Sequence, residues 1–395
     1  MSKCTYKEGY VDKSDSLART FDCDEDSFPG RDVCIFHDKE NYNEHRNQAI
    51  KRFATKVIQS VHENKPLKCI GYYLPSFDFA SLLQDEEKYF RQPIFFAKAT
   101  FYEQANFSKT IFMKEADFSD VVFLKEANFR GATFCGKVDF LSAKFCTDTT
   151  FVSANFSKIS YFTQARFYGK ANFRGAKFGD GAEFIETVFV AKTSFTNSLF
   201  EQPNKVTFDK SDLSHVSFAD CDITKIRFED KIIWRGKDGF TIIEEEWIKD
   251  KLKGEERNES PDISLELVLS VYRNLRENYE FRLRYDDAGN FFKKEMELKR
   301  KYREKKSQNG PTLITKNNWF TRQFSLTGLY YHLSKYGESI KMPTITGIVV
   351  LLLSTLFFSM QSNLTLEPTL PLFTSNNSTD PTFIDSKEPQ TQHIG

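Results

Sequence analysis

Three cysteines and one histidine near the start of the chain have the residue types for a metal site. Cys4, Cys23, Cys34 and His37 fall within the first 40 residues, and "CIFH" contains Cys34 and His37 as a C-x2-H pair. A tight turn of this spacing can place two ligands on one ion. Three thiolates and one imidazole form a closed tetrahedral zinc site of the structural type. The sequence therefore predicts one structural zinc at these four residues.

Alternatives stay open for this cluster. The spacing between Cys4 and Cys23 is long and loose, which also fits three ordinary reduced cysteines and a polar histidine. His45 or Cys69 could take the fourth ligand position instead. With all four positions filled by protein side chains, such a site would leave no open position for catalysis.

Other catalytic chemistry has little support in the sequence. The chain contains no G-x-S-x-G, no Gly-rich phosphate loop, and no histidine pair at helical spacing in an apolar setting. Its six histidines are scattered. We therefore predict that the protein is not an enzyme and has no catalytic residues.

Phenylalanine recurs with an unusual period through the middle of the chain. From position 96 to position 200 the spacing alternates between 5 and 6. After "EQPNKV" the pattern continues in fives to position 228, with Leu213 and Ile223 between the phenylalanines. A small or β-branched residue stands two positions earlier, often followed by Asn or Asp, as in "ANF". At about 100° per residue, a helix would put these phenylalanines on two separate faces, so one helical seam is excluded.

Short strands satisfy every position of this pattern. Residues two apart on a strand face the same way, so the small residue and the phenylalanine both point inward. Each unit then forms one side of a square, and units of six carry one extra corner residue. A coil takes about 22 residues, which predicts about six coils, a rod of about 30 Å and an internal column of phenylalanines.

These units resemble those of pentapeptide-repeat proteins, over residues 93–229. The resemblance implies a mainly β fold, the right-handed quadrilateral β-helix. Residues 1–40 resemble a Cys/His-rich module that precedes the repeats in related proteins. The order of parts is similar to that of repeat proteins linked to ion-channel-like membrane regions. This chain departs from those by having one apolar span and no Gly-Tyr-Gly-type filter.

The segments on either side of the repeats are expected to be mostly helical. Residues 41–92 are expected to cap the first coil, with an amphipathic helix at 41–63 and a strand at "KCIGYYLP". Residues 230–261 are expected to be a linker and residues 262–307 a helical hairpin. One such hairpin cannot bury its own face, so it must pack on the rod, on a copy of itself or on a partner.

The faces of these three helices follow from their apolar spacing. The expected buried residues are Ile50, Phe53, Val57 and Val61 in the first helix, Leu265, Val268, Tyr272 and Leu275 in the second, and Ala288, Phe292, Met296 and Leu298 in the third.

A membrane span is predicted near the other end of the chain. Residues 342–366 carry no charge, and 342–362 have the length of one transmembrane helix after a juxtamembrane segment at 308–341. Residues 290–341 contain 12 Lys/Arg and 4 Asp/Glu, whereas 362–395 contain one Lys and four acids. The positive-inside rule predicts a single-pass protein with a cytoplasmic N-terminal region and its C-terminal tail outside. This tail, residues 363–395, is expected to be disordered and contains sequons at Asn363, Asn376 and Asn377.

Charge and organisation narrow the function. Residues 96–228 contain 17 Lys/Arg and 15 Asp/Glu, so neither an acidic DNA mimic nor a nucleic-acid-binding rod is expected. We predict a membrane-anchored, non-enzymatic scaffold whose cytoplasmic rod binds a protein partner through its outer faces. Membrane lipid is a second expected partner, and a homo-oligomer is compatible with the sequence. The alternative is a regulatory or truncated relative of a repeat-linked ion channel.

Overall fold

The computed structural model describes residues 2–12, 17–40, 44–82, 89–253, 264–305, 313–337 and 339–362. The tail predicted at 363–395, with its sequons, lies outside these residues. The chain divides into two compact units, residues 1–332 and 333–395, and each is described by itself.

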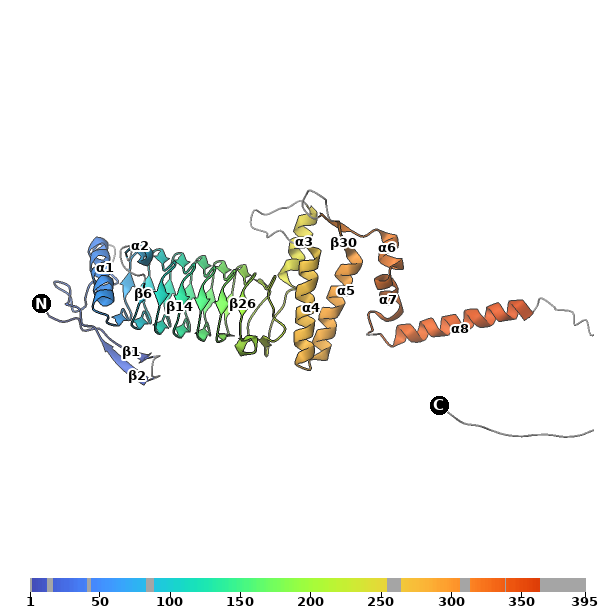
Figure 1. Ribbon diagram of the computed structural model, residues 1–395, viewed down its shortest axis with the longest axis horizontal. Helices are drawn as coiled ribbons and strands as arrows, with labels where there is room; N and C mark the ends of the chain where they lie inside the picture. The colour runs from blue at the N-terminus through green and yellow to red at the C-terminus, as the bar shows by residue number, and fades with distance from the viewer. Residues whose placement is uncertain are drawn as a thin grey trace, which may run out of the picture. The chain divides into compact units, whose positions relative to one another are not determined.

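The first unit contains a β-solenoid built from very short strands, which stack coil upon coil (Figure 1). Its four sides are four parallel sheets, here numbered in the order in which the chain visits them. Side 1 contains β3 Leu67–Lys68, β7 Ile94–Phe95, β11 Ala116–Asp117, β15 Val138–Asp139, β19 Ser160–Tyr161, β23 Ala182–Ile185, β27 Val206–Asp209 and β29 Arg227–Phe228. Side 2 contains β4 Tyr73–Leu74, β8 Thr100–Phe101, β12 Val122–Phe123, β16 Lys144–Phe145, β20 Arg166–Phe167 and β24 Val188–Phe189.

The other two sides complete each coil. Side 3 contains β5 Phe77–Asp78, β9 Ala105–Asn106, β13 Ala127–Asn128, β17 Thr149–Thr150, β21 Ala171–Asn172, β25 Thr193–Ser194 and β28 Val216–Ser217. Side 4 contains β6 Tyr89–Phe90, β10 Ile111–Phe112, β14 Thr133–Phe134, β18 Asn155–Phe156, β22 Lys177–Phe178 and β26 Leu199–Phe200.

The register between coils follows the sequence period. Phe112 pairs with Phe134 of the next coil, as a coil with two sides of five and two of six requires. Where the spacing becomes pure fives the coil is shorter, and Phe208 pairs with Phe228. The interruption "EQPNKV" is absorbed by a short 3-10 helix, η1 Pro203–Lys205, in a longer coil that pairs Ala182 with Val206. The predicted mainly β solenoid is confirmed.

The interior is filled by phenylalanine, in four columns rather than the single column expected. Each side contributes one column, because nearly every coil places one phenylalanine inward per side, with Leu74, Leu213 and Ile223 in the inward places near the two ends. Phe129 of side 3 stacks on Phe151 with ring centroids 4.9 Å apart and an interplanar angle of 4°, and it meets Phe140 of the opposite side, side 1, edge-on at 5.6 Å. The small residues predicted to point inward are buried, for example Ala127 and Ala132. Offset stacks and edge-to-face pairs are the arrangements that aromatic rings prefer.

Left-handed residues form the corners that follow sides 1 and 3, and they lie between phenylalanines five apart, such as Phe118 and Phe123, rather than in the six-residue units. Positive φ angles recur once for every two sides, at Lys98, Lys109, Asp120, Gly131, Ser142, Ser153, Gln164 and Gly175. For a residue with a side chain this conformation costs about 1–2 kcal/mol. The corner is held in place because its amide bonds to the next coil; Asp120 N donates to Leu141 O at 2.7 Å.

The N-terminal cap begins with a hairpin of β1 Lys7–Asp12 and β2 Leu17–Asp22 and continues with α1 Arg46–His62 and α2 Phe79–Leu82. Helix α1 buries Phe53 and Val57 as predicted, whereas Ile50 and Val61 are only half-buried. The stretch "KCIGYYLP" is not one strand, because a corner at Gly71 divides it between sides 1 and 2. The solenoid therefore starts at Leu67, earlier than the position 93 expected from the phenylalanines.

The C-terminal cap consists of α3 Ile243–Lys253, α4 Leu265–Phe281 and α5 Tyr285–Lys301 (Figure 1). The expected linker at 230–261 thus includes a helix, with Trp234 buried ahead of it. The hairpin α4–α5 packs on the rod, which is the first of the three options that the sequence left open. The side-chain amide of Asn278 donates to Ile223 O and Ile226 O, both at 2.7 Å, and so satisfies carbonyls at the open end of the last coil.

The buried face of α5 differs from the expected one. All four residues predicted for α4 are buried, but in α5 the buried positions are Phe291 and Glu295 instead of Phe292 and Met296. Glu295 is accepted in this interior because Arg276 lies 3.0 Å and Lys299 2.7 Å from its carboxylate. A buried charge is tolerated when it is paired and hydrogen-bonded.

The remaining elements follow the hairpin. They are the antiparallel pair β30 Tyr302–Lys305 and β31 Leu313–Lys316, the short helices α6 Trp319–Phe324 and α7 Leu326–Ser334, and the apolar helix α8 Lys341–Ser362. The expected juxtamembrane segment at 308–341 is thus partly strand and partly helix over its described residues.

The junction of rod and C-terminal cap contains a buried carboxyl group that predicts a pH dependence. Glu244 Oε1 accepts from Ser217 Oγ at 2.8 Å and from Phe218 N at 3.0 Å, and burial raises the pKa of Glu244 to about 7. A carboxyl whose pKa is higher in the folded state contributes stability below its unfolded pKa, and this stability is lost as the pH rises through 7.

We expect Glu244→Gln, which stays neutral, to remove this loss. The variant and the wild type should melt alike near pH 5, and at pH 8 the variant should be more stable by about 3 kcal/mol. Thermal unfolding of the full chain in detergent across this pH range measures it, with the exposed Glu266→Gln as the control. Parallel pH profiles for Glu244→Gln and the wild type would show that the carboxyl is not protonated in the folded protein.

Candidate metal centre at the N-terminal cap

The hairpin and one tight turn bring the four predicted ligands together. Cys4 precedes β1 and Cys23 directly follows β2, so the antiparallel pairing of these strands places the two cysteines side by side. Cys34 and His37 lie on one turn, which is closed by His37 N donating to Cys34 O at 3.0 Å. All four side chains are buried. Their ligand atoms lie within 4.8 Å of one another.

The separations match those between ligands around one ion. Cys23 Sγ lies 3.7 Å from Cys34 Sγ, and His37 Nδ1 lies 3.3 Å from Cys34 Sγ and 3.6 Å from Cys4 Sγ. In a tetrahedron with Zn–S of about 2.3 Å and Zn–N of about 2.0 Å, the edges are about 3.8 Å between sulfurs and about 3.5 Å between sulfur and nitrogen. The cluster could therefore hold a metal ion.

The orientation of His37 is fixed from outside the cluster. Its Nε2 lies 3.0 Å from Ile70 O, and since a carbonyl only accepts, Nε2 carries the proton and donates. In the neutral ring Nδ1 is then a free acceptor facing the thiols, which is the tautomer that a ligand needs. The ring stacks on Tyr6 with centroids 3.6 Å apart, so His37 is held between Tyr6 of the N-terminal cap and Ile70 of the first coil.

The thiols have divergent acidities in this setting. The contact with Cys34 lowers the pKa of Cys23, while the same contact and burial raise the pKa of Cys34, and burial raises the pKa of Cys4. Because the three sulfurs lie so close together, the cluster favours a state with one thiolate over a state with three thiolates. A bound cation would be needed to stabilise the second and third thiolates.

The alternative fourth ligands lie elsewhere in the described part of the chain. The His45 ring contacts Phe28 at 4.3 Å, and Cys69 is buried in the first coil, where its amide donates to Phe95 O at 2.8 Å. The sequence reasoning missed Tyr6 and Ile70, which orient His37. The stretch "CIGYY" could have indicated them, because a glycine at a corner permits close approach of another chain segment.

Comparison with known proteins bears on the solenoid. Residues 162–204 match the family model described as pentapeptide repeats in nine copies. No curated protein and no solved structure matches the chain. With the same four parallel sheets and inward phenylalanines on both sides of the matched residues, the central domain is a pentapeptide-repeat β-solenoid.

The contact between Tyr6 and the corner at Gly71 generates a prediction. A Cβ at Gly71 would overlap the Tyr6 hydroxyl, at a φ of +68°. We expect Gly71→Ala to displace Tyr6 from His37 and open the cluster, with a loss of roughly 1–3 kcal/mol. Mass spectrometry of maleimide labelling of the full chain should then show faster modification of Cys4, Cys23 and Cys34.

Gly30→Ala is the matched control, because Gly30 also has a positive φ of +76° but no atom within 4 Å of the added Cβ. Equal labelling rates for the two variants would mean that backbone strain alone, without the Tyr6 contact, accounts for any effect.

Proposed function

We propose that this protein is a membrane-anchored, non-enzymatic scaffold whose rod presents its outer sides to a protein partner. The observation that carries the proposal is the combination in one chain of a β-solenoid and an apolar helix with no buried residues. Pentapeptide-repeat β-solenoids are commonly protein-interaction scaffolds and are typically non-catalytic. Their interior is filled by stacked side chains, so their outer residues are free to serve binding.

The membrane anchor is the helix α8. Its segment Lys341–Gln361 has 21 residues, and none of its most apolar stretch is buried. A transmembrane helix needs about 20 such residues. A core helix of a soluble domain would be largely buried, and this one is not, which favours insertion into a bilayer.

The two helices before α8 support a placement at the membrane surface. Trp319, Phe320 and Phe324 of α6 pack ring against ring, yet each is more than 60% exposed. Asn317 ties this segment to α5 by donating to Arg300 O at 2.9 Å. Exposed aromatic clusters next to basic residues are typical of the headgroup region. The excess of Lys/Arg before α8 favours a cytoplasmic rod and an outside tail.

We further propose that the N-terminal cluster holds one structural zinc. Cys4, Cys23, Cys34 and His37 supply the soft sulfur and imidazole ligands that zinc prefers in closed sites. Bound zinc would supply positive charge that holds all three thiolates. His37 couples the cluster to Ile70, so the metal would lock the N-terminal cap onto the first coil.

Elemental analysis of the purified full chain should find about one zinc per chain. Cys34→Ser should remove it, whereas Cys135→Ser, outside the cluster, should not. Because protons compete for the thiolates, zinc should be retained near neutral pH and released on acidification. Zinc-free wild-type protein, or equal zinc in Cys34→Ser, would contradict the proposed site.

Crosslinking in intact cells, followed by membrane fractionation and mass spectrometry, tests the scaffold as a whole. We expect the protein in the membrane fraction, with crosslinks from residues of the outer sides of the solenoid to a soluble protein. Recovery in the soluble fraction would refute the anchor. Crosslinks concentrated between 317–361 and a multi-span channel protein would favour the channel-linked alternative instead.

A further inference from the structure

The four sides of the solenoid differ in the chemistry of their outward residues. Side 3 presents a polar row of Asn106, Asn128, Thr150, Asn172 and Ser194. On side 2 most outward residues are apolar. They are Tyr73, Val122 and Val188 before the inward residue, and Tyr102, Leu124, Cys146, Tyr168 and Val190 after it.

The apolar rows of side 2 are accessible to solvent. Tyr168 is 46% and Val190 51% exposed, and Leu124 and Cys146 are half-buried by their neighbours in the stack. The rows repeat every coil, so they form a continuous stripe along the rod. Exposed apolar surface that is contiguous and bordered by polar groups is characteristic of protein interaction sites.

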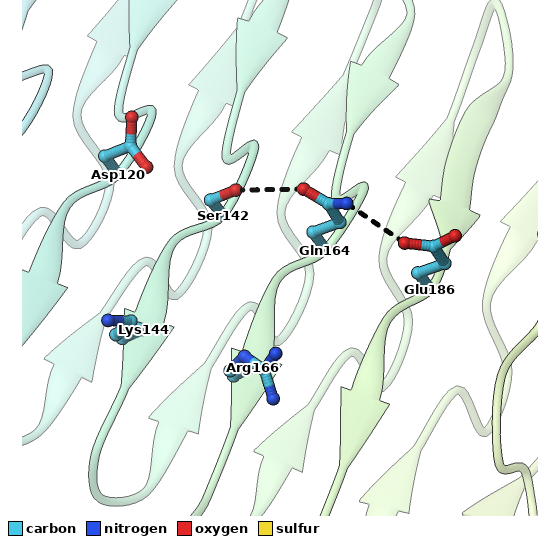
Figure 2. A pocket seen from close by; sticks show the side chains of 6 residues that line it. All are labelled: Asp120, Ser142, Lys144, Gln164, Arg166 and Glu186. Atoms are coloured by element: carbon cyan, nitrogen blue, oxygen red, sulfur yellow. Dashed lines mark hydrogen bonds between the residues drawn. The ribbon is translucent and has the colours of Figure 1, made fainter.

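Two cations lie in the middle of this stripe. Lys144 and Arg166 pair in register on adjacent strands, β16 and β20, and Figure 2 shows them side by side. Like charges directly opposite each other on neighbouring strands are destabilising. Among the residues that the structure describes, neither forms an ion pair, whereas Lys177 and Lys205 of the same rod are paired with Glu201 and Asp180.

The same cations line one wall of a groove of about 440 Å³. The opposite wall is a polar ladder along the corner of the coils, in which Ser142 Oγ donates to Gln164 Oε1 at 3.3 Å and Gln164 Nε2 donates to Glu186 at 3.0 Å (Figure 2). Asp120 continues this wall at the other end. Carboxylates at both ends of the groove disfavour an extended polyanion, such as nucleic acid or an anionic membrane surface.

We propose that side 2, centred on Lys144 and Arg166, binds an amphipathic helix of a partner protein that carries two carboxylates one turn apart and apolar residues on the turns before and after. Successive coils lie about 4.8 Å apart, which matches the rise of about 4.5–6 Å between residues three or four apart on a helix. Residues two apart on an extended strand are about 6.6 Å apart and match less well. The inference rests on the scaffold function proposed above and names its binding face.

The apolar residues of side 2 continue along the rod on both sides of the two cations, at the same spacing as the turns of a helix. From Val122 to Val188 the stripe covers three coil steps, about 14 Å, or about ten helical residues. A second copy of this chain fits less well, because packing side 2 on itself would bring two pairs of cations into one apolar interface. An acidic, apolar helix neutralises the cations and covers the stripe at once.

The test uses the full chain in lipid nanodiscs and a synthetic, stapled helical peptide of about three turns with Glu at i and i+4 and Leu on the flanking turns. Fluorescence anisotropy should show saturable binding. The double variant Lys144→Glu/Arg166→Glu should bind this peptide at least tenfold more weakly, which corresponds to about 1.4 kcal/mol. The same variant should instead bind a peptide in which Lys replaces each Glu. Tyr168→Asp should also weaken binding. Arg130→Glu/Arg174→Glu, the same charge change on side 3, should leave binding unchanged.

Four results would overturn the proposal. One is the lack of saturable binding by the wild type, and a second is an affinity for the acidic peptide that Lys144→Glu/Arg166→Glu does not change. Another is binding that is insensitive to Tyr168→Asp and displaced by inorganic phosphate, which indicates a simple anion site. The last is equal weakening by the side 3 variant, which indicates only long-range charge. Melting curves that match the wild type exclude misfolding as the cause.

The scaffold proposal and the binding face can fail separately. If the peptide test fails but crosslinks reach a soluble partner from side 1, 3 or 4, the scaffold stands and only the choice of side 2 is wrong. If no crosslink reaches a partner from any side, the scaffold itself is wrong.

Discussion

The rest of the structure depends on the in-register stacking of backbone between coils. Parallel strands this short hold only if the same side returns to the same place, so the length of each coil has to be almost constant. Phe112 above Phe134 and Phe208 above Phe228 show two of the coil lengths that this chain uses. The longer coil, which pairs Ala182 with Val206, is accommodated locally by the 3-10 helix at Pro203–Lys205.

A solenoid buries its sides but leaves two open ends, and both ends of this one are covered. At the start, the N-terminal module and α1 cover the first coil, and the Cys/His cluster is joined to that coil through His37 and Ile70. At the other end, Asn278 satisfies carbonyls that no further coil can reach, and Glu244 accepts from Ser217 and Phe218. Covered ends keep the rod from adding strands of other molecules.

The same stacking constraint separates the role of the solenoid interior from that of its outer surface. Phenylalanine fills the interior at every coil and leaves no room for chemistry there, so variation is confined to the outward positions and the caps. The Cys/His cluster that could hold a metal ion lies in a cap, where the chain is free of the repeat. The cations Lys144 and Arg166 are built on an outer side, where stacking brings residues one full coil apart in the sequence next to each other.

The sequence by itself determined the solenoid, because a period of 5 and 6 with small residues two positions earlier fits only short sides with inward aromatic rings. It also indicated Cys4, Cys23, Cys34 and His37 as candidate metal ligands, but it left His45 and Cys69 open for the fourth position. Whether Cys4 and Cys23 lie together could not be decided from the sequence, because their proximity depends on the β1–β2 hairpin. Nor could the sequence show that α5 buries Glu295 and Phe291, because the burial of Glu295 depends on its ion pair with Arg276 across the α4–α5 hairpin. The start of the solenoid at Leu67 and the placement of α4 on the last coil were likewise decided by packing between distant segments, which leaves no local trace in the sequence.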